Sequence, residues 1–481
     1  MTNTRGILEG WLYVPLGRVT DLAALKQRLT FLPRKFPMPG EEPVEPIYLF
    51  DESRPGYIGV PREFGLQAFQ SLQYDDLTSL GAAITVPKLP DPHHPRVRNP
   101  QAQAQFMADL RAAFDHHRSF TAVAPTGSGK TVCALNTAAL LGRRTLILVH
   151  LERLMLQWQE EIIDKLGVPP ERVGIVQQDR CEWQGKDFCV GLLHSVVRRD
   201  YPAAFYRAFG LVVFDEMHKV GSQFFAPAVH LFPSHHRLGL SATPTRKDGG
   251  ERVFFWHLGP IRVTSEAEAL PMKVYVVPYQ TRQKLWGSTH GSRIKCLTAD
   301  KDRNALIVTF IKRFWENNRH GLVVSESVQH LQELMRLAER AGVPGSAMGQ
   351  FTSERHHKVA DPANPGKSKW VKKKTDRAEL DRVKGESRII FATYGMFTEG
   401  IDVPRLDAGI DATPRSSATQ LIGRIRRPLP GKRMPIWITL RDKGCSMSES
   451  YYRKRCTDYH ASNAEVVIYG TKEASVDARG A

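Results

Sequence analysis

The sequence has few of the features that mark secreted or membrane proteins. Its six cysteines are scattered and include no C-x-x-C pair, which argues against a zinc ribbon and against a disulfide framework. No apolar run reaches the length of a membrane span. The first residues, MTNTRGILEGWLYV, lack the charged start and continuous apolar core of a signal peptide. These absences predict a protein that stays in a reducing cytoplasm.

Length and composition indicate a folded protein with several domains. A chain of 481 residues has room for about three domains. Its 42% of hydrophobic and 24% of charged residues match the balance of soluble globular proteins. The 67 Lys and Arg outnumber the 50 Asp and Glu, which gives a net charge of +17. This excess favours polyanionic partners, either nucleic acid or an anionic membrane surface.

Strand-like and helix-like runs divide the chain. Residues 1–95 mix short apolar stretches with many breakers and end in a Pro/His-rich linker, which predicts a small α+β accessory domain that is a candidate for contacting DNA. In residues 96–265, apolar runs such as RTLILVH and GLVVFDE alternate with helix-like stretches, as in a parallel sheet covered by helices. Residues 266–455 repeat this alternation, so two tandem α/β lobes are expected. The basic stretch at about 352–378 is predicted to be a flexible insertion, and residues 456–481 a frayed tail.

A glycine-rich turn lies between the strand-like FTAV and the helix-like VCALNTAALL. At a helix N-terminus, backbone N–H groups can approach phosphate; Lys130 would supply a cation to the β- and γ-phosphates, and Thr131 a hydroxyl to Mg²⁺. The residues expected to cradle the nucleotide are Ala124, Pro125, Thr126, Gly127, Ser128, Gly129, Lys130 and Thr131. The turn therefore predicts a site for ATP and Mg²⁺.

Two adjacent carboxylates end an apolar strand downstream, in LVVFDEMH. Asp215 is placed to hold Mg²⁺ through water, and Glu216 to orient and deprotonate the attacking water. A lone Asp-Glu pair is more often a solvated turn. Its position at a strand end after a phosphate-binding loop favours the catalytic interpretation.

These segments resemble the motifs of superfamily 2 helicases of the DExH type. APTGSGKT has the A-x-x-G-x-G-K-T form of the first motif, DEMH with His218 resembles motif II, and SATP resembles motif III. ATYGMFTEGIDVP resembles motif V and QLIGRIRRP motif VI, so the resemblance spans most of residues 98–428. It implies two RecA-like lobes that close on ATP, with Arg424 and Arg427 as arginine fingers. It also implies nucleotide contacts in the second lobe from Gly400, Asp402 and Gln420.

The same resemblance implies nucleic-acid contacts in both lobes. They lie in the motifs LVHLER, LLHS and VVSES and in motif V: His150, Arg153, His194, Ser195, Ser325 and Thr393. Such contacts go mainly to the phosphate backbone, so little base specificity is expected.

Residues outside the motifs narrow the branch of the family. The form DEMH and the lack of a full Q-motif disfavour the DEAD-box RNA helicases. SATPTRKDG resembles the repair helicases of the xeroderma pigmentosum group B type and the UvsW-like branch-migration helicases of bacteriophages. In the former an Arg-Glu-Asp triplet follows motif III. Here Arg246-Lys247-Asp248 has a basic middle residue, and Arg246 is a candidate for contacting nucleic acid.

Two further segments are candidates for ligand contact. Arg98 and Gln101 have the R-x-x-Q spacing found ahead of the phosphate loop in many of these motors, which makes Gln101 a candidate for adenine recognition; an ordinary amphipathic helix is the alternative. The basic insertion offers cations for phosphates and a ring for stacking on a base, with a solvated loop as the alternative. Its candidate residues are Trp370, Lys372, Lys373 and Lys374.

The sequence thus predicts a DNA-stimulated, Mg²⁺-dependent ATPase that moves along DNA and unwinds or branch-migrates forked and four-way junctions, 3′ to 5′ by resemblance. Forked or branched DNA is the expected partner, with no membrane, in the cytoplasm, or that of the host if a phage encodes the chain. Three alternatives remain: an RNA helicase, a duplex translocase that separates no strands, and a nucleotide-gated clamp that barely turns over. The complete set of Glu216, Arg424 and Arg427 argues against the clamp.

Overall fold

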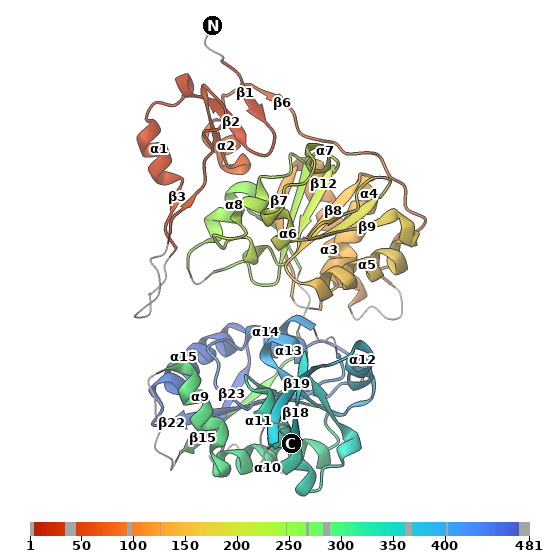
Figure 1. The fold of residues 1–481 in the computed structure, drawn as a ribbon, viewed down its shortest axis with the longest axis vertical. Coiled ribbons are helices and arrows are strands. Elements are labelled where there is room, and N and C mark those ends of the chain that lie inside the picture. Colours follow the sequence, from red (N-terminus) through yellow and green to blue (C-terminus); the bar gives the residue numbers. More distant parts are fainter. Residues whose placement is uncertain are drawn as a thin grey trace. The chain divides into compact units, whose positions relative to one another are not determined.

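The chain forms two compact units, residues 1–267 and 268–481 (Figure 1). The computed structural model describes residues 4–33, 45–93, 99–125, 127–246, 248–265, 269–281, 289–360, 368–400 and 403–470. Each unit has a hydrophobic core around its own large, mostly parallel sheet. The two tandem α/β lobes predicted from the sequence are confirmed.

The first lobe is built on an eight-stranded sheet in the order β10-β9-β11-β8-β12-β13-β7-β14. Only β10 runs antiparallel to its neighbour. The strands are β7 (Ser119–Val123), β8 (Thr145–Val149), β9 (Val173–Gln177), β10 (Arg180–Cys181), β11 (Phe188–Leu192), β12 (Leu211–Phe214), β13 (His236–Ser241) and β14 (Ile261–Thr264). The helices are α3 (Pro100–His116), α4 (Lys130–Leu141), α5 (Glu152–Leu166), α6 (Leu193–Arg198), α7 (Ala203–Tyr206) and α8 (Glu251–Leu258). Central strands such as TLILV are buried along their whole length because helices cover both faces of the sheet.

A small α+β domain precedes this lobe, as predicted, and has a four-stranded sheet in the order β5-β2-β1-β6. Its strands are β1 (Gly6–Leu8), β2 (Leu12–Pro15), β5 (Tyr57–Val60) and β6 (Tyr74–Asp76). The helices α1 (Leu22–Arg28) and α2 (Arg62–Ala68) and the short pair β3 (Thr30–Phe31) and β4 (Ile47–Tyr48) complete it.

Two fully buried arginines join this N-terminal domain to the first lobe. Arg62 of the domain donates to the carbonyl of Ser234 at 2.7 Å. In the opposite direction, Arg237 of the lobe donates to the carbonyl of Gly10 at 3.0 Å. Next to them the Trp11 ring stacks on the His230 ring of the lobe, with 4.4 Å between centroids. The N-terminal domain and the first lobe therefore belong to one unit.

The second lobe has a seven-stranded, fully parallel sheet in the order β17-β20-β16-β21-β22-β15-β23. The strands are β15 (Lys273–Gln280), β16 (Gly321–Ser325), β17 (Met348–Phe351), β20 (Ile389–Thr393), β21 (Ala408–Asp411), β22 (Ile436–Lys443) and β23 (Glu465–Ile468). The helices are α9 (His290–Ala299), α10 (Lys301–Glu316), α11 (Val328–Arg340), α12 (Arg377–Glu386), α13 (Tyr394–Gly400), α14 (Thr419–Ile425) and α15 (Ser446–Ala461).

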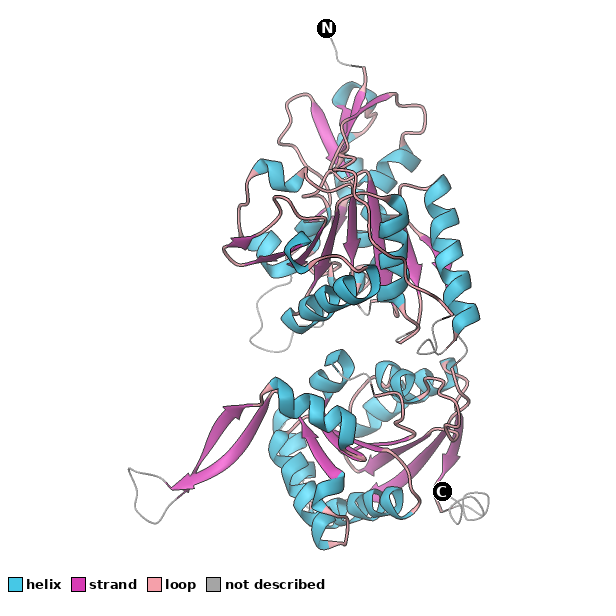
Figure 2. Ribbon diagram, turned by 90° about the vertical axis from the view of Figure 1, so that its right-hand side faces the viewer, coloured by secondary structure: helices cyan, strands magenta, loops and turns pink. Residues whose placement is uncertain are grey.

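The basic insertion forms an antiparallel ribbon, so its interpretation as a loop is wrong for the described residues. The strands β18 (Glu354–Ala360) and β19 (Ser368–Lys374) pair along their length. Figure 2 shows the ribbon extending away from the rest of the lobe. At its base Arg355 forms a 2.5 Å ion pair with Glu379 of α12. Cross-strand backbone hydrogen bonds satisfy the peptide groups, which explains how a stretch poor in apolar residues is ordered.

The expected tail from residue 456 is also largely part of the lobe. α15 continues to Ala461, and Tyr459 is fully buried in the core. β23 then pairs in parallel with β15 at the edge of the sheet. The prediction failed because a polar helix and a four-residue strand carry little hydrophobic signal of their own. Residues 471–481 lie outside the described part of the chain.

Candidate functional site

Three neighbouring strands of the first lobe end at the same edge of the sheet. β13 lies between β12 and β7, and the backbone register pairs Phe214 with Gly239 and Ser241 with Val123. The glycine-rich turn follows β7, the carboxylates follow β12, and the SATP segment follows β13. Because parallel strands place their carboxyl ends together, three segments far apart in the sequence meet at one site.

The glycine-rich turn is shaped to leave its backbone open. Gly127 and Gly129 have φ values of +83° and +87°, which favour glycine. A Cβ on Gly129 would also lie 2.2 Å from Nε2 of the buried Gln103. Lys130 begins α4, and its ammonium donates to the carbonyl of Ala124 at 2.9 Å. A backbone cradle with a cation at a helix N-terminus fits a polyphosphate.

The carboxylate of Asp215 is nearly buried. Among the described contacts, one side chain forms a hydrogen bond with it. Trp158 of α5 donates its indole N–H to Oδ2 at 2.9 Å. Burial, and then the neighbouring Glu216, raise the pKa of Asp215, while Trp158 and Lys130 oppose the rise. Such an oxygen acceptor fits a hard divalent cation, which would restore the charged form. Sequence reasoning missed Trp158, whose only signal is its place in an amphipathic helix.

The next residue is held in a strained backbone conformation. Glu216 has φ +50° and ψ 50°, in the left-handed region that non-glycine residues rarely adopt. Its Oε2 lies 3.3 Å from Nδ1 of His218. Burial lowers the pKa of His218 to about 4, so the imidazole is neutral at pH 7. The same Nδ1 lies 3.1 Å from Oγ of Ser241, which joins the DEMH turn to the SATP segment.

The glutamine beside the glycine-rich turn is not the predicted one. Gln101 is exposed in the first turn of α3, where it stays a candidate for adenine. Gln103, two residues on, is buried and packs against Gly129. Its buried position in an amphipathic helix could have been inferred from the sequence, but its contact with the turn could not.

The two arginines of motif VI belong to the second lobe. Arg424 lies in the last turn of α14, with its guanidinium 5.8 Å from the centroid of the Phe397 ring. Arg427 follows the end of that helix and is only 6% exposed. Their action on a nucleotide bound by the first lobe stays a prediction.

Some predicted residues cannot be placed. Outside the described residues lie Arg98, Thr126 and Asp402. The backbone is described, but not the side chain or its burial, at Trp370, Lys372, Gly400 and Gln420.

Of the six nucleic-acid contacts predicted in the motifs of the two lobes, four have side chains that reach the surface at least in part. They are His150, Arg153, His194 and Thr393. His150 follows β8, and burial lowers its pKa to about 3, so it would act as a neutral imidazole. The exposed His194 packs edge-on against Phe225, with 4.7 Å between ring centroids.

Three other predicted contacts are used inside the fold. Ser195 is 5% exposed, and its Oγ accepts from the backbone N–H of Gln178 at 2.9 Å. Ser325 is fully buried, with Oγ 3.0 Å from Nδ1 of His330. The guanidinium of Arg246 is engaged by neighbouring residues. Internal hydrogen bonds occupy these side chains, and their direct contact with nucleic acid stays a prediction.

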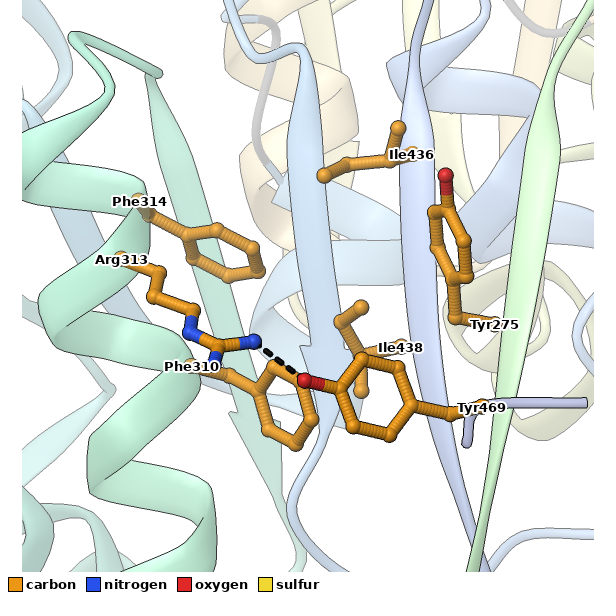
Figure 3. Close-up of a pocket in the computed structure, with 7 residues that line it drawn as sticks. All are labelled: Tyr275, Phe310, Arg313, Phe314, Ile436, Ile438 and Tyr469. Carbon is orange, nitrogen blue, oxygen red and sulfur yellow. Dashed lines mark hydrogen bonds between the residues drawn. The ribbon is translucent and has the colours of Figure 1, made fainter. Parts of the chain in front are cut away.

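The second lobe also contains an apolar pocket that the motifs do not line. Its residues are Tyr275, Phe310, Arg313, Phe314, Ile436, Ile438 and Tyr469 (Figure 3). Arg313 donates a hydrogen bond to the Tyr469 hydroxyl there. Elsewhere, none of the helices in the described ranges is both long and apolar enough to cross a membrane.

Known proteins are similar to the part of the chain that bears this site. Residues 96–246 match the family model described as type III restriction enzyme, res subunit. A protein of Acanthamoeba polyphaga mimivirus, described as an ATP-dependent RNA helicase, is 25% identical over 441 residues, 87% of this chain and 77% of its own. A DNA 3′-5′ translocase, XPB2, of Sulfurisphaera tokodaii is 27% identical over 382 residues, 70% of this chain and 81% of its own.

A solved structure has the same fold at low identity. That of Dbp5 of S. cerevisiae, bound to RNA and ADP BeF3, has a TM-score of 0.52 and 13% identity and covers 79% of this chain and 92% of its own. Three findings indicate the same class of protein. They are the motifs at the shared strand edge, the two α/β lobes and the relatives of this sequence. The chain has the fold of two tandem RecA-like lobes, and its sequence is similar to those of superfamily 2 helicases.

Proposed function

We propose that this helicase is a Mg²⁺-dependent ATPase, stimulated by DNA, that moves 3′ to 5′ and unwinds or branch-migrates forked and four-way junctions. The observation that carries the proposal is the meeting of Lys130, Asp215 and Glu216 at the edge formed by β7, β12 and β13. The relative named as a DNA 3′-5′ translocase supports DNA as the track. The net charge of +17 suits either nucleic acid.

In the first lobe each residue has a proposed role that follows from its position. Lys130 leaves its carbonyl partners for the β- and γ-phosphates, to which N–H groups of the turn also donate. Thr131 and Asp215 would hold Mg²⁺, which when bound neutralises developing phosphate charge. Glu216 orients the attacking water and takes its proton. Trp158 fixes the orientation of the Asp215 carboxylate.

In the second lobe, Arg424 and Arg427 are proposed to stabilise the charge of the transferring phosphoryl group. Arginine fingers of this kind contribute on the order of 10³ to 10⁵ in rate. ATP-driven approach of the lobes would then change the spacing between the nucleic-acid contacts of each lobe, which produces stepping. His150, Arg153, His194 and Thr393 are the proposed contacts to the phosphate backbone.

The test is steady-state ATP hydrolysis without nucleic acid and with single-stranded, duplex, forked and four-way DNA or RNA, using Glu216→Gln as the blank. We expect the strongest stimulation from branched DNA. Stimulation by RNA alone would assign the chain to RNA remodelling, as the name of the mimivirus relative suggests. Turnover that stays slow with every saturating nucleic acid would instead favour a nucleotide-gated clamp.

A further inference from the structure

Arg246 uses its side chain to connect two loops of the first lobe. Nε donates to Oδ1 of Asp248 at 2.8 Å, and Nη2 donates to Oδ2 at 2.5 Å. The remaining nitrogen, Nη1, donates to the backbone carbonyl of His218 in the DEMH turn. A guanidinium that binds a carboxylate with two nitrogens and a carbonyl with the third is fixed in position. One side chain therefore joins the DEMH turn, called the ATPase turn below, to the loop after SATP.

Glycines on both sides make room for this guanidinium. A Cβ on Gly221 would lie 2.6 Å from Cδ of Arg246, and one on Gly250 would lie 2.8 Å from its Nε. The Cβ on Gly250 would also lie 2.9 Å from the carbonyl oxygen of Gly221. The two loops approach so closely that the arginine side chain fills the space between them.

The same loop leads directly into α8, which packs against the N-terminal domain. Oδ1 of Asp248 accepts from the N–H of Gly250 at 3.0 Å, just before the helix begins at Glu251. On α8, Val253 is buried in the core of the N-terminal domain. The Trp256 ring lies 4.9 Å from that of Phe64 in α2, and the Arg252 guanidinium 5.4 Å from that of Phe31.

We propose that Arg246 is a positioning residue that couples the ATPase turn at His218 to the N-terminal domain through Asp248 and α8. This inference rests on the nucleic-acid-stimulated ATPase proposed above. A shift of the His218 carbonyl during the ATP cycle displaces the start of α8 and so the surface that carries Phe31 and Phe64. Coupling between sites is reciprocal, so nucleic acid held by the N-terminal domain acts on the ATPase turn by the same route.

The first test separates coupling from simple bracing. Arg246→Ala, Arg246→Lys and Asp248→Asn are compared with Arg180→Ala. This control removes a matched two-nitrogen pair between Arg180 of β10 and Glu182 just after it. The readouts are melting temperature, KM for ATP, and kcat with and without DNA. We expect all the Arg246 and Asp248 variants to keep KM within about threefold and to lose about tenfold of the stimulation by DNA, a loss inside the usual range of coupling. Unchanged stimulation, whatever the melting temperature, would overturn the proposal.

The second test asks whether the route runs through α8. Phe31→Ala and Arg246→Ala are combined in a double-mutant cycle on DNA-stimulated kcat. If Phe31 and Arg246 act on one route, the DNA-stimulated kcat of the double variant falls by about tenfold, as it does in the more affected single variant. Independent losses that multiply to about a hundredfold would contradict it. If the wild-type chain shows no stimulation by any nucleic acid, the proposed function fails, and the cycle on basal kcat then decides the coupling by the same criterion.

Discussion

The two lobes place carboxylates at corresponding ends of central strands but supply them with different partners. In the first lobe, Asp215 after β12 has the neutral indole of Trp158 as its side-chain hydrogen-bond donor. In the second, Asp442 near the end of β22 accepts from Nε and Nη2 of Arg303 at 2.7 and 3.2 Å. Both members of this pair are almost completely buried. A second buried arginine, Arg455, lies 3.4 Å from an oxygen of Asp411 at the end of β21.

The difference fits an architecture that serves the proposed chemistry in the first lobe and rigidity in the second. Separating a buried ion pair leaves an uncompensated charge in the interior. Because that charge is costly, a buried pair stays together once it has formed. The second lobe therefore gives both strand-end carboxylates a buried arginine as neighbour, although burial still raises the pKa of Asp411. The first lobe leaves Asp215 with a raised pKa and without an arginine partner among the described contacts, which suits the Mg²⁺ that we propose arrives with ATP.

The largest effect is expected from Glu216→Gln, which keeps the shape of the side chain but removes the proposed base. We expect kcat to fall by about 10² to 10⁴, the usual contribution of general-base catalysis, with ATP binding retained. Equilibrium nucleotide binding and single-turnover hydrolysis measure the two quantities separately. Hydrolysis at the wild-type rate would show that the base lies elsewhere and that the chemical role of this strand end is misassigned.

A comparable effect, but on stability, is expected from Arg303→Ala in the second lobe. Loss of one partner from the buried pair should cost about 3 to 5 kcal/mol of the free energy of unfolding, because the Asp442 carboxylate would lack its partner. Arg336→Ala is the matched control, since it removes an exposed ion pair with Glu333 on α11. Denaturant unfolding should show little change for the control. Equal stability of the two variants would remove the proposed contrast between the lobes.

The sequence predicted the parts of the molecule that depend on local pattern. Buried strands such as LVVF, the glycine-rich turn and the DEMH carboxylates were predicted because each has a continuous apolar run or a fixed spacing. Contacts between distant residues were not predicted. Neither the indole of Trp158 beside Asp215 nor the internal use of Arg246 has a local signature. The basic ribbon was missed because backbone pairing, not hydrophobic periodicity, orders it.

A smaller effect is expected from Trp158→Phe, and it concerns pH. The indole N–H favours the charged form of Asp215, so its removal should raise the pKa of that carboxyl further. Asp215 binds a cation only when ionised, so the acid limb of the kcat/KM profile should move to higher pH, by about one unit for the removal of one hydrogen bond to a charged group. Trp437→Phe, which removes a buried indole from the second lobe, should leave the limb in place. An unmoved limb in Trp158→Phe would mean that the indole only fills space.

The smallest effect should come from the ribbon of the second lobe. Lys373 and Lys374 are exposed on β19. If the ribbon grips duplex DNA near the fork, Lys373→Ala with Lys374→Ala should reduce the slope of log affinity against log salt by up to about 0.9 for each phosphate that is no longer neutralised. The basal ATPase should stay unchanged, as should the slope in Lys312→Ala, an exposed lysine of α10. A slope equal to that of the wild type would show that these lysines face only solvent.

The reciprocal arginines between the N-terminal domain and the first lobe also set an order for biosynthesis. The carbonyl that accepts from Arg62 lies 172 residues further along the chain, and Arg237 is 227 residues from Gly10. At about 5 to 20 residues per second, a ribosome needs roughly ten to forty seconds to deliver these partners. Until then the surface that carries Trp11 has nothing to dock against. The N-terminal domain, which leaves the ribosome before the first lobe, is thus among the last parts of its unit to be completed. A pause within that interval would lengthen its exposure to chaperones and proteases.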